Sequence, residues 1–62
     1  MRKQIISAME EFGKPVELFE IIEKVVSKNQ ECREIDIRIE IDFMIWEGQL
    51  NRLSDLRIEL TK

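Results

Sequence analysis

The chain has 62 residues, a net charge of −3, one cysteine and no histidine. This length fits one domain, over residues 1–62, with a thin core, because a domain of about 60 residues buries only about 60% of the surface that its unfolded chain exposes. The single cysteine, Cys32, excludes an intrachain disulfide, and without histidine the commonest zinc ligand is also missing. No histidine base can activate Cys32 or a serine, so we expect no enzyme.

A helix is predicted over residues 2–12, and its end is well marked. Gly13 tolerates the left-handed conformation that closes many helices, and Pro15 cannot continue one. Apolar residues recur at helical spacing within this segment, so one stripe of it should be buried. The residues of this stripe are Ile5, Ala8, Met9 and Phe12.

A second helix is predicted over residues 16–28. Glu20 precedes Lys24 by four residues, which is the order that favours a helix. The pattern ends near Asn29, a residue that suits either a helix-ending turn or the cap of the next element. The predicted buried stripe consists of Leu18, Ile21, Ile22 and Val25.

Residues 34–50 have two interpretations. Isoleucines alternate with charged residues, and β-branched side chains in alternation favour a strand. The stretch is longer than the usual strand of about five or six residues, however, and the chain after Gly48 is too short to pair along it. We therefore favour a helix that begins between Glu31 and Asp36. Such a helix has two opposed apolar faces, with Ile37, Ile41, Met44 and Ile45 on one and Ile35, Ile39, Phe43 and Trp46 on the other.

The last segment is predicted to be a β-hairpin. Ser54 and Asp55 are residues of turn-forming type, and the apolar residues after them alternate with charged ones, as in a half-buried strand. The expected fold class is therefore mainly α with a C-terminal β-hairpin. If residues 34–47 are extended instead, the alternative is an α+β fold with two helices followed by a β-meander.

Several short motifs occur in order along the chain. They are Phe12-Gly13-Lys14-Pro15-Val16, Glu20-Ile21-Ile22, Met44-Ile45-Trp46-Glu47-Gly48-Gln49-Leu50, and Arg52-Leu53-Ser54-Asp55 leading to Leu60-Thr61. Together with three predicted helices and a hairpin, they make the chain resemble a small winged helix-turn-helix domain of the transcription-regulator type. The resemblance implies a DNA-binding ancestor, in which the third helix enters the major groove and the wing touches the DNA backbone.

The charge of the third predicted helix departs from that family. Residues 34–47 contain five acidic residues and one arginine, a net charge of −4. Neutralisation of phosphates supplies most of the non-specific affinity of proteins for DNA, so DNA should repel this helix. The basic residues that remain as candidate phosphate contacts are Arg2, Lys3, Arg38, Arg52 and Arg57.

The second apolar face of the third helix is the strongest candidate site. Its aromatic residues can each bury about 150 to 250 Å², and so large an apolar patch is rarely left in water. Either the first two helices wrap both sides of the third helix, or this face contacts a second copy of the chain or a basic protein partner. The candidate interface residues are Ile35, Ile39, Phe43 and Trp46.

Two functions are expected from these patterns. The first is a non-catalytic module that acts through protein–protein contacts, most simply as a homodimer through the third helix. The alternative is a DNA-binding transcriptional regulator that contacts phosphates through the wing and the N-terminal basic residues. We expect no metal, cofactor or small-molecule ligand. No apolar run approaches the roughly 18 residues of a membrane span, and the N-terminus lacks the apolar core of a signal peptide, so we expect a cytoplasmic protein.

Overall fold

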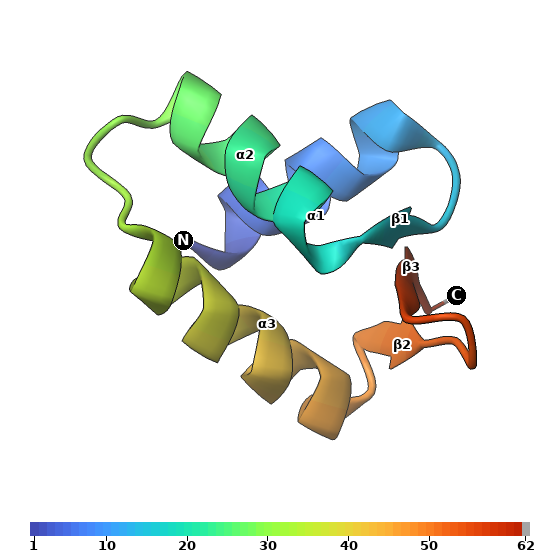
Figure 1. The fold of residues 1–62 in the computed structure, drawn as a ribbon. Helices are drawn as coiled ribbons and strands as arrows, with labels where there is room; N and C mark the ends of the chain where they lie inside the picture. Colours follow the sequence, from blue (N-terminus) through green and yellow to red (C-terminus); the bar gives the residue numbers. More distant parts are fainter. Residues whose placement is uncertain (62) are drawn as a thin grey trace.

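The computed structural model describes residues 1–61, which form three helices and a small antiparallel sheet (Figure 1). The predicted fold class, mainly α with a C-terminal hairpin, is confirmed. The extended alternative for residues 34–47 is wrong, because these residues form a helix. The elements in chain order are α1 (Arg2–Phe12), β1 (Val16–Glu17), α2 (Leu18–Lys28), α3 (Glu34–Glu47), β2 (Leu50–Arg52) and β3 (Arg57–Leu60).

Helix α1 ends where the sequence predicts. Gly13 has a φ of 66°, and its N–H donates a hydrogen bond to the carbonyl of Met9. This left-handed conformation suits glycine, since a side chain at positive φ crowds the backbone. Ile5, Ala8 and Met9 are buried as predicted, whereas Phe12 at the end of α1 is only partly buried.

Helix α2 begins two residues later than predicted. Val16 and Glu17 are not helical but form β1, which pairs antiparallel with β3 so that Val16 lies opposite Ile58. This pairing buries Val16, and a β-branched side chain suits a paired strand. The contact is made with a segment at the far end of the chain, so the local helical pattern did not reveal it.

The sheet has the strand order β1-β3-β2, with β3 in the centre. The predicted hairpin joins β2 to β3, with Leu50 opposite Leu60 and Arg52 opposite Ile58. The turn is closed by the N–H of Leu53, which donates to the carbonyl of Arg57 at 2.7 Å.

Within that turn Leu56 has a φ of 73°, a conformation that β-hairpin turns usually assign to glycine or asparagine. Its side chain is 72% exposed. The hairpin therefore forms despite an unfavourable turn residue.

The core lies where the three helices meet the sheet. Figure 1 shows α1 and α2 on one side of the core, α3 crossing opposite them, and the strands at one end of α3. Within residues 1–61, no helix is long and apolar enough to cross a membrane. The largest fully buried side chains are Ile5, Ile21, Val25, Ile37, Ile41, Met44, Leu50 and Ile58.

Candidate functional site on the outer face of α3

One face of α3 is part of the core. Ile37, Ile41 and Met44 are each 0% exposed, and their spacing of four and three residues places them on one side of the helix. The helix ends at Gly48, which has a φ of 87°. The next N–H, that of Gln49, donates to the carbonyl of Met44, and the chain turns into β2. This face holds α3 against the other elements.

The opposite face of α3 is also apolar, but none of the other helices and strands within residues 1–61 covers it. We call its four residues, Ile35, Ile39, Phe43 and Trp46, the outer stripe. The helices α1 and α2 do not wrap both sides of α3, so the outer stripe is not part of this chain's core. Its exposed fractions are 56% for Ile35, 49% for Ile39, 54% for Phe43 and 84% for Trp46. Near its C-terminal end, Ile39, Phe43 and Trp46 line a shallow hollow together with Asp42.

The outer stripe has an acidic edge on one side, formed by Asp36, Glu40 and Glu47. Arg2, at the start of α1, reaches this edge and neutralises part of it. Its Nε lies 2.7 Å from Oε2 of Glu40, and its Nη1 lies 2.8 Å from Oε1 of Glu47. The hydrogen bond to Glu40 raises the pKa of Arg2. The most acidic helix of the chain thus receives a counter-charge from α1 on this side.

The other edge of the outer stripe alternates in charge. Glu34, Arg38 and Asp42 follow one another at intervals of four residues, and we call them the alternating edge. Arg52 on β2 approaches Asp42, with Nη2 and Oδ1 3.7 Å apart. Among residues 1–61, Arg38 has no ion-pair partner within 4 Å.

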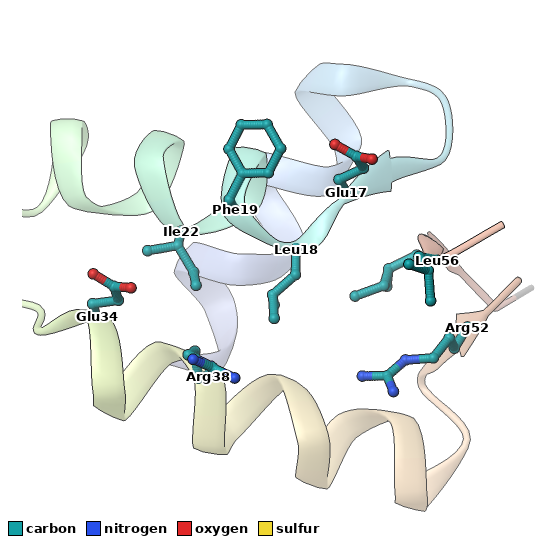
Figure 2. A pocket seen from close by; sticks show the side chains of 9 residues that line it. Glu17, Leu18, Phe19, Ile22, Glu34, Arg38, Arg52 and Leu56 are labelled. Carbon is teal, nitrogen blue, oxygen red and sulfur yellow. The ribbon is translucent and has the colours of Figure 1, made fainter.

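A second exposed feature is an open groove between α2, α3 and the hairpin (Figure 2). Figure 2 shows Arg52 reaching from the hairpin toward α3, while Phe19 points away from α3. Two arginines and two glutamates line the groove, so their charges balance and do not select an anionic ligand. The lining residues are Glu17, Leu18, Phe19, Ile22, Glu34, Arg38, Arg52, Leu56 and Ile58.

The five candidate phosphate contacts do not form one basic surface. Arg38 and Arg52 line the groove, whereas Lys3 lines a hollow between α1 and α2. Arg2 is held by two carboxylates of α3, and Nε of Arg57 lies 3.5 Å from Asp55 within the hairpin. Sequence reasoning missed the role of Arg2, because its partners are distant in the chain and no local spacing signals such a pair.

Two further observations bear on the site. Across residues 1–61, no group of three or more histidine, cysteine, aspartate or glutamate side chains is arranged to hold a metal ion. Comparisons with models of known protein families, with curated proteins and with solved structures find no match.

Proposed function

We propose that this protein is a non-catalytic interaction module whose outer stripe binds another protein, most simply a second copy of the chain. The observation that carries the proposal is the 84% exposure of Trp46 in line with Ile35, Ile39 and Phe43. Isolated exposed apolar residues are ordinary, but four of them along one helix face form a patch typical of an interface. Aromatic residues are also enriched at the centres of protein interfaces.

The free energy available from covering the outer stripe supports this proposal. Burial of apolar surface contributes about 25 cal/mol per Å². Phe43 and Trp46 can each bury about 150 to 250 Å², so covering their exposed parts is worth on the order of 5 kcal/mol before the entropic cost of association. A second copy is the simplest partner, because an apolar stripe is complementary to itself and a small domain gains stability by pairing.

The charge distribution favours a protein partner over DNA. The net charge of α3 is −4, and three of the five candidate phosphate contacts, Arg2, Arg52 and Arg57, already lie within 4 Å of a carboxylate. A relationship to winged helix-turn-helix domains is part of the proposal, and the order of three helices followed by a hairpin supports it. We also assign the module to the cytoplasm, since a lone thiol suits a reducing compartment.

A matched pair of phenylalanines tests the interface. Phe43 and Phe19 are both 54% exposed, but only Phe43 belongs to the outer stripe. Phe43→Ala should raise the dimer dissociation constant at least about thirtyfold, the loss expected for an interface hot spot, whereas Phe19→Ala should leave it unchanged. Sedimentation equilibrium measures both constants. The only tryptophan, Trp46, provides a second signal, because its emission should shift to longer wavelength as dilution exposes it.

Two results would contradict the proposed interface. A wild-type chain that stays monomeric at high micromolar concentration, with the emission of a solvated tryptophan, would contradict the proposal. Equal effects of the two phenylalanine substitutions would do the same. An anisotropy titration with mixed-sequence duplex DNA at low salt tests the alternative. Tight binding that falls steeply with salt and is lost in Arg38→Ala would favour a DNA-binding regulator.

A further inference from the structure

The two edges of the outer stripe differ in a way that specifies how two copies would meet. The acidic edge carries Asp36, Glu40 and Glu47. Its nearby cations are Arg2, which lies beside Glu40 and Glu47, and Arg33, whose Nε lies 3.5 Å from Oδ2 of Asp36. The alternating edge carries an arginine between two acids, and Arg38 there has no partner within residues 1–61. A partner helix that supplied a carboxylate beside Arg38 would complete this edge.

We infer that two copies pair through α3 in an antiparallel arrangement about a twofold axis, with Arg38 of each copy beside Asp42 of the partner subunit. This inference rests on the proposed function. The axis passes close to the middle of α3, and Arg38 and Asp42 lie on either side of that point, one helical turn apart. The twofold rotation places Arg38 of each copy beside Asp42 of the partner subunit. The pair therefore forms twice in the dimer.

The apolar residues fit the same arrangement. Trp46 and Ile35 lie near opposite ends of the outer stripe, and Ile39 and Phe43 lie between them. In an antiparallel pair each aromatic residue meets an isoleucine of the partner. In a parallel pair the two copies of Trp46 would oppose each other, and so would the two of Phe43. The antiparallel arrangement therefore matches large side chains with smaller ones, as tight packing requires.

The charges distinguish the two orientations more strongly. In an antiparallel twofold pair each edge of the helix faces the same edge of the partner helix, whereas in a parallel pair it faces the opposite edge. Parallel pairing would set the alternating edge against the acidic edge, so that Glu34 and Asp42 would meet carboxylates and only Arg38 would meet opposite charges. Antiparallel pairing joins the two alternating edges, and unlike charges then meet at the rim of the interface. Complementary rim charges of this kind determine register and orientation.

Arg2 reduces the one repulsion that antiparallel pairing creates. The two acidic edges then face each other, and Glu40, in the middle of α3, lies closest to the axis. Nε of Arg2 lies 2.7 Å from Glu40, so this carboxylate is already paired before two copies meet. Two outer stripes facing each other would bury on the order of 1,000 Å², which is at the lower limit for a specific interface.

Reversal of the charges tests this arrangement. Arg38→Glu and Asp42→Arg should each raise the dissociation constant of the homodimer about tenfold, because each places two like-charged pairs at the rim. When the two variants are mixed, a heterodimer should form preferentially, since opposite charges meet at both positions again. The double variant Arg38→Asp/Asp42→Arg should recover the homodimer. Native mass spectrometry and sedimentation at low ionic strength measure these species, and Glu23→Arg, on the exposed side of α2, is the matched control.

Cys32, which precedes α3, reports the orientation independently. Spin labels on the two copies of Cys32 should be farther apart than the length of α3, which is roughly 20 Å for its 14 residues. Parallel pairing predicts a shorter distance and efficient cross-linking of the two thiols by a short bismaleimide.

The outcomes separate the two proposals. A wild-type dimer that Phe43→Ala dissociates, but that shows no recovery on mixing or has adjacent Cys32 thiols, overturns the antiparallel arrangement and leaves the interface in place. A wild-type monomer overturns both.

Discussion

The two apolar faces of α3 are similar in composition but differ in what covers them. Ile37, Ile41 and Met44 are 0% exposed, whereas the residues of the outer stripe are about half exposed or more. In most helices of small domains the apolar side faces the core and the polar side faces water. In α3 the charged residues lie along both edges, between two apolar faces. Apolar residues therefore create surfaces that are stable only when covered, and the packing of the other elements decides which of these surfaces is covered within the chain.

The largest expected effect is a difference in the free energy of unfolding between substitutions on the two apolar faces of α3. Ile41→Ala should lower the free energy of unfolding by about 2 to 5 kcal/mol, because it opens a cavity in the core. Ile39→Ala, on the outer stripe, should lower it by less than about 1 kcal/mol at concentrations where the chain is monomeric, since its side chain is 49% exposed there. Urea denaturation followed by circular dichroism measures both.

A domain of this size has little stability to lose, and a loss at the upper end of the range expected for Ile41→Ala would abolish folding altogether. Ile41→Val supplies a milder change, with an expected loss of about 0.5 to 1.5 kcal/mol. Equal losses for the substitutions at Ile41 and Ile39 would show that the two faces of α3 do not differ as described.

A smaller effect tests whether an exposed apolar side chain outside α3 also contributes to dimer formation. Leu56 is 72% exposed but lies in the hairpin turn, with a φ of 73°. Leu56→Gly should raise the free energy of unfolding by about 1 kcal/mol, because glycine adopts this conformation without steric cost. Its dimer dissociation constant should equal that of the wild type. Destabilisation, or loss of the dimer, would mean that Leu56 contributes to packing or to the interface.

The smallest expected effect concerns the ion pair between Glu11 of α1 and Lys28 of α2, neither of which belongs to α3. Lys28 donates a hydrogen bond to Glu11, which lowers the pKa of Glu11 below its ordinary value of 4.5, with smaller contributions from the charges of Lys28 and Lys24. A lowered pKa stabilises the folded chain above pH 4.5, and this contribution is lost as the pH falls through the lowered value. Since Glu11 is exposed, the midpoint of urea denaturation should change only slightly as the pH falls through this range.

Glu11→Gln should remove this part of the pH dependence, while Glu10→Gln, one residue earlier, should retain it. The monomer–dimer equilibrium of both variants at pH 7 should match that of the wild type. A dimer weakened by Glu11→Gln would place the interface on α1 and α2 rather than on α3.

Much of the local structure was predictable from the sequence. Helical periodicity located α1 and α3, and glycine capping located the end of α1 at Gly13. Alternation located β3. The sequence also predicts the candidate interface residues, because a helix over residues 34–47 has two apolar faces. These features depend on neighbours within a few residues, and local spacing records such neighbours directly.

Local patterns in the chain therefore specify three helices, a hairpin and two apolar faces on α3, but not the first residue of α2. Three features became known from the folded chain alone: Val16 joins a strand, Ile41 is buried while Ile39 is not, and Arg2 pairs with Glu40. Each of these outcomes depends on contacts between segments far apart in the chain. A periodic pattern shows which side chains share a face, but the packing of distant elements determines which face is covered.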